Sequence, residues 1–138
     1  MRILLDTNVV LDVLLNREPW VTEASAIWKA NDDGRLVGYL MASALTDIFY
    51  VARRLAGREA ARAAVQTCLD AFEFCPVDRR MLELAHFLPG ADFEDNLQMV
   101  CAERAQLDAI VTRDPDDFKL STVPVTTPVQ VLAWLGQM

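Results

Sequence analysis

The sequence has 138 residues, of which 53% are hydrophobic, and a formal net charge of −7 from 20 acidic and 13 basic side chains. The length predicts a single domain over residues 1–138, and the hydrophobic fraction excludes a disordered chain. No apolar run approaches the roughly 18 residues that a membrane-spanning helix needs, and the acidic balance argues against a nucleic-acid binder that works by bulk positive charge.

Short apolar runs alternate with longer helical stretches along the chain. In the first half we expect a strand at 3–5, helices over 9–16 and 20–31, a strand at 36–41, and a helix from Ser43 to about 55 that Gly57 breaks or bends before it continues to about 71. In the second half we expect a strand near 73–77, helices begun by Asp78 and Asp92, strands at 109–112 and 123–125, and a last helix begun by Thr127-Pro128. This alternation predicts an α/β fold, with a short parallel sheet of four or five strands flanked by helices on both faces.

The cysteine and histidine content limits the chemistry that the chain can perform. Cys68, Cys75 and Cys101 form no C-x-x-C pair, so we expect neither a disulfide framework nor a cysteine zinc site. The N-terminus does not read as a signal peptide, and together these features predict a cytoplasmic protein. The single histidine, His86, lies near an expected helix end, where it is expected to interact with the helix dipole rather than to act in catalysis.

Four aspartates fall where parallel strands end or where the following helices begin. They are Asp6, Asp47, Asp95 and Asp114. Each alone is more often a turn residue or a partner of a helix dipole. Their shared position predicts a ligand site, because ligands of open parallel sheets bind beyond the carboxyl ends of the strands.

Asp95 is the least easily explained by local structure. It shares a helical face with Met99 and Ala102, so it is expected to point toward the protein, where a carboxylate is costly unless it is paired or binds a metal. Asp92 either shares that face or only caps the helix. Asp12, with Asn8 four residues before it, is expected to lie on a solvent-facing polar stripe outside the site.

Carboxylates gathered without histidine or cysteine favour a hard divalent cation. Mg²⁺ and Mn²⁺ prefer oxygen ligands, and Mg²⁺ is commonly bound together with substrate phosphates. The chemistry that fits such a site is metal-assisted hydrolysis of a phosphate ester.

Four segments of the chain carry a family likeness. They are Leu4-Leu5-Asp6-Thr7-Asn8-Val9-Val10-Leu11-Asp12-Val13-Leu14, Ser43-Ala44-Leu45-Thr46-Asp47-Ile48-Phe49-Tyr50, Asp92-Phe93-Glu94-Asp95-Asn96-Leu97 and Ile110-Val111-Thr112-Arg113-Asp114-Pro115-Asp116-Asp117-Phe118. In order and spacing they resemble the four acidic motifs of PIN domains, and the length resembles that of the VapC-type toxins of toxin–antitoxin pairs.

The resemblance implies a Mg²⁺- or Mn²⁺-dependent endoribonuclease, usually a homodimer, inhibited by a cognate antitoxin protein. Such an enzyme hydrolyses RNA phosphodiesters through a metal-activated water and leaves 5′-phosphate and 3′-hydroxyl ends. By motif position, the four aspartates Asp6, Asp47, Asp95 and Asp114 would be catalytic and would bind the metal. Asp47 stands where the family often has the longer Glu, which favours contact through water.

Three further residues and one basic segment complete the expected site. Asn8 and Thr112 would orient ligand or water, and Asp92 would support the cluster. Between residues 48 and 66 the charge balance is +3, and four arginines there are candidate RNA contacts: Arg53, Arg54, Arg58 and Arg62. The other interpretation of these arginines is a solvated helix face. The apolar helices over 9–28 form either a dimer or antitoxin surface or ordinary core.

Other folds that gather aspartates at strand ends fit less well. A receiver domain needs paired acids after the first strand and a late lysine, but only Asp6 follows that strand, and the only lysines are Lys29 and Lys119. A phosphatase of the haloacid-dehalogenase type needs D-x-D, and Asp6-Thr7-Asn8 lacks the second acid. The remaining alternative is a catalytically silent PIN-like module that acts through RNA or protein contacts.

Overall fold

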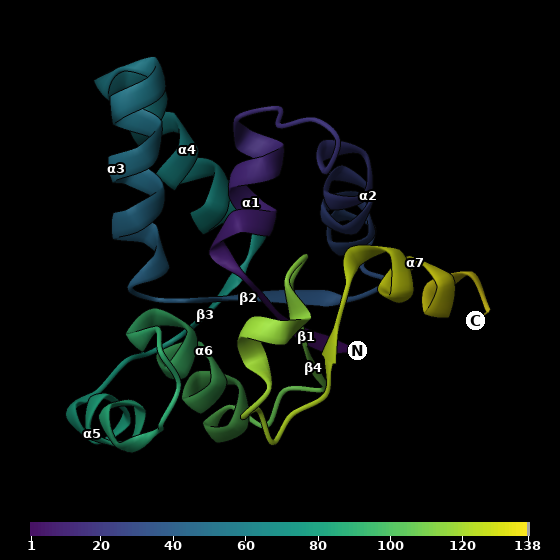
Figure 1. Cartoon of the computed structure of the whole chain (residues 1–138). Coiled ribbons are helices and arrows are strands. Elements are labelled where there is room, and N and C mark those ends of the chain that lie inside the picture. Colours follow the sequence, from purple (N-terminus) through teal and green to yellow (C-terminus); the bar gives the residue numbers. More distant parts are fainter. Residues whose placement is uncertain (138) are drawn as a thin grey trace.

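Five parallel strands form the centre of the molecule in the computed structural model, which describes residues 1–137 (Figure 1). They are β1 (Arg2–Leu5), β2 (Val37–Met41), β3 (Glu73–Cys75), β4 (Ala109–Val111) and β5 (Val125–Thr126). Their order is β3-β2-β1-β4-β5, and every pairing between neighbours is parallel. The predicted α/β class and parallel sheet are confirmed, and the sheet has five strands.

Helices cover both faces of this sheet. They are α1 (Thr7–Leu14), α2 (Val21–Asp32), α3 (Ala44–Ala56), α4 (Arg58–Ala71), α5 (Arg79–Phe87), α6 (Phe93–Arg104), the 3-10 helix η1 (Pro115–Phe118) and α7 (Pro128–Gly136). Figure 1 shows α1 to α4 and α7 above the sheet and α5 and α6 below it, with α3 and α4 forming an arm that projects away from the strands. None of the helices within residues 1–137 is long and apolar enough to cross a membrane.

Alternate side chains of the strands belong to two separate hydrophobic cores. In β1, Ile3 and Leu5 pack under α1, α2 and the arm, while Leu4 packs against α5 and α6. In β4, Ile110 lies on the same face as Leu4 and Val111 lies on the other. Burial on both faces explains why these strands are continuous apolar runs rather than alternating ones.

The helix boundaries follow local capping signals. Asp78 accepts a hydrogen bond from the Met81 N–H at 2.9 Å, and Thr127 makes a capping box with Gln130, so both expected helix starts are confirmed. Ser43 stands at the N-cap of α3 but its side chain caps no backbone group. The break at Gly57 is also confirmed, because its φ of +95° ends α3 and begins α4.

The apolar helices expected as either an interface or core are mainly core. Val9, Val10, Ala24 and Ile27 are buried against the sheet, so α1 and α2 leave only part of their apolar surface near solvent. The three cysteines are buried free thiols.

One buried amide holds the turn that leads into α6. Asn96 donates from Nδ2 to the carbonyl oxygens of Ala85, Leu88 and Gly90, at 3.2 to 3.3 Å. These three carbonyls belong to the end of α5 and the loop after it. The contacts therefore fix where α6 begins and where its first-turn acids lie.

Replacing Asn96 by Ala is expected to lower the free energy of unfolding by roughly 1–3 kcal/mol, because buried carbonyls lose their donor. Asn96→Asp should cost more, since it places an acceptor against those carbonyls. Urea denaturation measures both, with Glu83→Ala on the exposed face of α5 as the control. An Asn96→Asp variant as stable as the wild type would contradict this role.

Candidate active site

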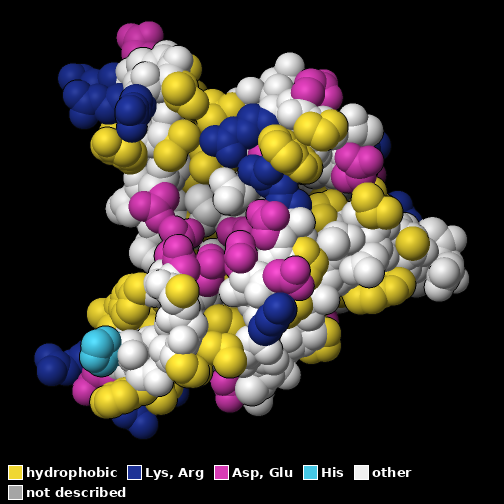
Figure 2. All heavy atoms as spheres, in the orientation of Figure 1, with side chains coloured by type: hydrophobic (Ala, Val, Ile, Leu, Met, Phe, Trp, Pro, Cys, Tyr) yellow, Lys and Arg dark blue, Asp and Glu magenta, His cyan; other side chains and the backbone are white. Residues whose placement is uncertain are grey.

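Acidic side chains gather where β1 and β4 end and α6 begins. Figure 2 shows them as a magenta group in a hollow between the arm of α3 and α4 and the lobe of α5 and α6. Asp6 comes directly after β1, and Asp114 lies in the loop after β4, beyond Thr112 and Arg113. Asp95 lies in the first turn of α6. The topology therefore brings three of the four predicted aspartates to one edge of the sheet.

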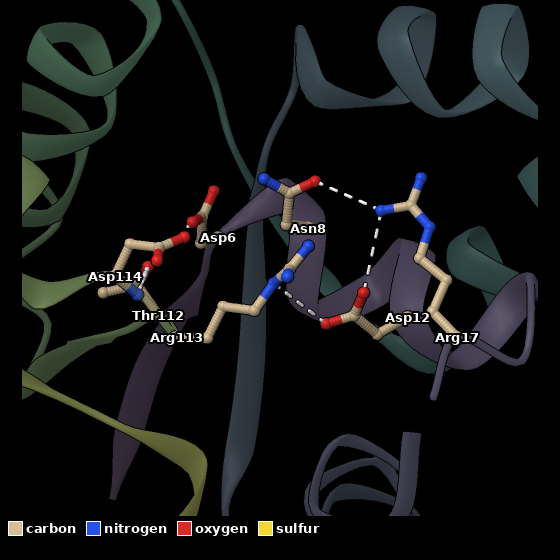
Figure 3. Close-up of polar contacts among 7 residues, drawn as sticks. All are labelled: Asp6, Asn8, Asp12, Arg17, Thr112, Arg113 and Asp114. Carbon is tan, nitrogen blue, oxygen red and sulfur yellow. Dashed lines mark hydrogen bonds and ion pairs between the residues drawn. The ribbon is translucent and has the colours of Figure 1, made fainter. Parts of the chain in front are cut away.

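Asp6 is the best-held carboxylate of the group, with 6% of its surface exposed. Thr112 donates from Oγ1 to one carboxylate oxygen at 2.8 Å, and Gln98 donates from Nε2 to the other at 3.2 Å. The Asp114 N–H in turn donates to Thr112 Oγ1 at 3.1 Å (Figure 3). Thr112 thus fixes the Asp6 carboxylate and the backbone of Asp114 through one hydroxyl group.

A fifth acid, Glu94, belongs to the cluster and was not predicted. Its Oε1 accepts hydrogen bonds from Thr7 Oγ1 at 3.2 Å and from Gln98 Nε2 at 3.5 Å. Gln98 therefore links Glu94 to Asp6. The sequence carries a signal for this pair, since Glu94 and Gln98 are four residues apart and share a helical face.

Asp92 caps α6 by accepting the Asp95 N–H at 3.0 Å, which confirms the expected cap. Asp95 itself is half-buried and lines a cavity of about 230 Å³ together with Asp92, Asp116 and Asp117. The last two belong to η1, which was not predicted because Asp114-Pro115-Asp116 is equally typical of a turn.

Burial and neighbouring negative charges both act on the Asp95 carboxyl. Burial, followed by the charges of Asp92, Asp6, Asp117 and Glu94, raises its pKa from 3.8 to about 7. The charges that perturb this carboxyl are all negative.

Glu94 is in a similar position. Burial and then the charge of Asp47 raise its pKa, while the Thr7 hydrogen bond lowers it. The exposed Asp47 therefore lies at the margin of the group, beside Glu94. Asp114 is exposed as well.

The oxygen atoms at the site are of the kind that binds a hard divalent cation. It offers carboxylate oxygens, and the buried Gln98 Oε1 has no hydrogen-bond partner. Within residues 1–137, no three acidic, histidine or cysteine side chains converge closely enough to enclose an ion in this arrangement. The excess of negative charge nevertheless favours a cation, because a bound cation would relieve the repulsion. Among the residues that the structure describes, Lys119 is the one positive side chain that lines the same cavity as Asp95.

The solvent-facing position expected for Asp12 is wrong. Asp12 is 1% exposed, and its carboxylate lies 3.6 Å from Arg17 Nη1 and 3.3 Å from Arg113 Nε. The polar stripe exists, but Arg17 and the loop after β4 cover it (Figure 3). Asn8 accepts from Arg17 at 3.4 Å, so its side chain contacts the arginine beside the acidic group.

The four candidate RNA-contacting arginines are exposed, at the end of the arm farthest from the sheet (Figure 1). The positive φ of Gly57 divides them between α3 and α4, so they form no continuous helical stripe. His86 lies in the last turn of α5, where the helix dipole favours it, and Figure 2 shows it at the edge of the lower lobe.

The raised pKa of Asp95 predicts a pH-dependent stability. The folded chain binds more protons than the unfolded chain between pH 3.8 and about 7, so the free energy of unfolding falls as the pH rises through this range. In EDTA at pH 8, Asp95→Asn should therefore be more stable than the wild type by about 1 kcal/mol or more, or ~3–5 °C in Tm.

This gain should shrink as the pH is lowered toward 4, and thermal unfolding across the pH range measures it. Glu83→Gln, which removes an exposed charge on α5, is the matched control and should show no such trend. A less stable Asp95→Asn at pH 8 would contradict the repulsion.

Comparisons with known proteins show the family and the fold of this chain. A family model described as the PIN domain matches residues 2–116. A search of curated proteins finds no significant match.

Solved structures of toxin–antitoxin proteins share the fold. DNA-bound VapBC from Salmonella typhimurium has a TM-score of 0.70 at 15% identity, covering 93% of this chain and 98% of that one. FitAcB from Neisseria gonorrhoeae has a TM-score of 0.66 at 18% identity, covering 92% and 98%. VapC20 of Mycobacterium tuberculosis, a Sarcin-Ricin loop cleaving toxin, has a TM-score of 0.63 at 16% identity, covering 78% and 86%.

Proposed function

Because this chain belongs to the PIN domain family, we propose that it is a divalent-metal-dependent endoribonuclease and the toxin of a toxin–antitoxin pair. The observation that carries the proposal is the acidic group at the strand ends, in which burial and neighbouring carboxylates, Asp6 among them, raise the pKa of both Glu94 and Asp95. A stable protein keeps such repulsion where function needs it.

Mg²⁺ or Mn²⁺ would be held by Asp6, Asp95 and Asp114, with Asp47 through water and Glu94 beside them. These carboxylates do not enclose an ion in the described arrangement, so binding would draw their side chains together. When bound, such a cation makes water more acidic and neutralises charge on phosphoryl oxygens. The protein's own contribution is orientation. Thr112 and Gln98 hold the Asp6 carboxylate at both oxygens, and such outer partners typically change metal affinity or activity by roughly 10- to 100-fold.

Glu94 is suited to act as the general base. Thr7 and Gln98 both donate to its Oε1. This leaves Oε2 available to accept a proton from an attacking water. Burial and the charge of Asp47 raise the pKa of this carboxyl, which makes it a stronger base than an exposed glutamate.

RNA and an antitoxin are the proposed partners. VapC20, which shares the fold, is a Sarcin-Ricin loop cleaving toxin, and several similar structures are toxin–antitoxin complexes. A negative site of this kind suits an inhibitor that inserts an Arg or Lys side chain in place of the cation. We further propose that the protein is a cytoplasmic homodimer.

The proposed activity predicts metal-dependent cleavage of structured RNA that EDTA abolishes. Asp6→Asn and Asp95→Asn should lose activity by more than 100-fold. Thr112→Ala should lose roughly 10- to 100-fold, because Asp6 loses its hydroxyl donor, and Thr112→Ser should recover most of it.

Gel assays of RNA cleavage and Mn²⁺ titration by calorimetry measure these effects. Glu83→Gln, remote from the acidic group, is the control. Cleavage that survives chelation would exclude this mechanism. RNA binding without any cleavage by the wild type would favour the silent binding module instead.

Expression of the chain alone is expected to arrest growth of its host, and co-expression of its upstream neighbour to relieve the arrest. Asp6→Asn should be harmless, because the toxicity depends on the acidic site. Growth curves and sequencing of cellular RNA ends measure the outcome. A wild-type chain that is harmless at high level and cuts no RNA would overturn the toxin assignment.

A further inference from the structure

A small cationic surface borders the acidic group on its α1 side. Arg17 follows α1. Arg113 lies between Thr112, which donates to Asp6, and Asp114, whose N–H donates to Thr112. Figure 3 shows the Arg113 guanidinium between the Asp6 and Asp12 carboxylates, and the Arg17 guanidinium on the other side of Asn8 from Asp6 and Asp114. Figure 2 shows dark-blue side chains beside the magenta group.

Both arginines are anchored on one buried carboxylate. The side chain of Asp12 is 2% exposed, whereas those of Arg17 and Arg113 are 28% and 20% exposed. Counted over these three side chains, one negative charge faces two positive charges, so they carry a net charge of about +1. Glu23 lines the same pocket as Asp12 and Arg113, on the α2 side. A protein that needed only to neutralise Asp12 would need only one arginine.

The two guanidinium groups keep much of their hydrogen-bonding capacity. Within residues 1–137, the Arg17 guanidinium donates one hydrogen bond, to Asn8. In the same described range the Arg113 guanidinium donates none, and its Nε is buried beside Asp12, so the two terminal nitrogens of Arg113 are the donors that remain for a ligand. Each guanidinium has five N–H donors in a fork that matches phosphate oxygens. The Arg113 guanidinium also lies over the Trp20 ring, 3.7 Å from its centre, and this cation–π contact ties it to the start of α2.

We propose that Arg17 and Arg113, held by Asp12 and by the Trp20 ring, bind a phosphate group of the RNA strand next to the one that enters the acidic site. The inference rests on the proposed ribonuclease function and names the residues that position its substrate. RNA is a polyanion, and the acidic site repels it. A fixed positive group beside that site reduces the electrostatic repulsion that the RNA meets.

This pair is better suited to that role than the arginines of the arm. The arm arginines are exposed at its far end, and ordering such side chains on binding costs conformational entropy. Arg17 and Arg113 are already held in place and adjoin Asp114 and Asn8. An acidic segment of a protein partner is the competing occupant, and the experiment below separates it from RNA.

The test measures RNA affinity against salt concentration by fluorescence anisotropy, with Asp95→Asn as the parent so that the RNA stays intact in Mg²⁺. Arg17→Ala leaves Asp12 paired with Arg113 and so preserves the fold. It should weaken binding roughly three- to tenfold and reduce the slope of log affinity against log salt by about 0.7, which corresponds to one lost phosphate contact.

Two matched variants sharpen the result. Arg113→Lys keeps the charge and loses the fork, so it should weaken binding with an unchanged salt slope. Arg80→Ala removes an exposed positive charge from α5 and should change neither quantity.

The outcomes are distinguishable. A parent that binds no RNA would count against the proposed ribonuclease function itself. RNA binding with the same affinity and slope in the parent and in Arg17→Ala would overturn this inference alone. The third outcome is an Arg17→Ala variant that keeps the salt slope of its RNA affinity but is no longer neutralised by the antitoxin. That result would assign the surface to a protein partner and would also overturn this inference.

Discussion

Mutual repulsion of carboxylates is the constraint around which this molecule is arranged. Parallel strands joined by helices on both faces bring every strand's carboxyl end to one edge, and here that edge carries Asp6, Asp114 and the first turn of α6. Neutral groups rather than cations hold the most buried of these acids, since Thr112 and Gln98 donate to Asp6. The fold therefore orients the charges without cancelling them.

The surroundings of the site resist that repulsion. Helix α6 is buried along most of its length in the hydrophobic core on the α5 and α6 face of the sheet. Asn96 ties the start of this helix to the end of α5. Because the helix cannot move outward without breaking these contacts, Glu94 and Asp95 stay close to Asp6 at the expense of raised pKa values. Stability stored in the core thus offsets strain at the site.

Much of the fold could be predicted because its signals are local. Continuous apolar strands, the caps Asp78 and Thr127, and the break at Gly57 each act within a few residues. At the site, the sequence predicts only the residues that strand ends bring together, such as Asp6 and Asp114. The spacing of Glu94 and Gln98 puts both on one helical face, but it does not say that Thr7, 87 residues earlier, meets that face. The burial of Asp12 likewise depends on Arg113, which follows β4 and is remote in the sequence.

The burial of the three thiols has a consequence for the chemistry that the core can undergo. Burial raises the pKa of Cys68 to about 11 and, mainly for the same reason, that of Cys101 to about 12. The thiolate is the form that oxidants and alkylating agents attack, so in the folded chain these sulfur atoms behave as inert apolar groups. Cys101 lies in α6, two turns beyond the acids of its first turn, so in the folded chain its thiol is shielded from the oxidation that would disturb the helix carrying Glu94 and Asp95.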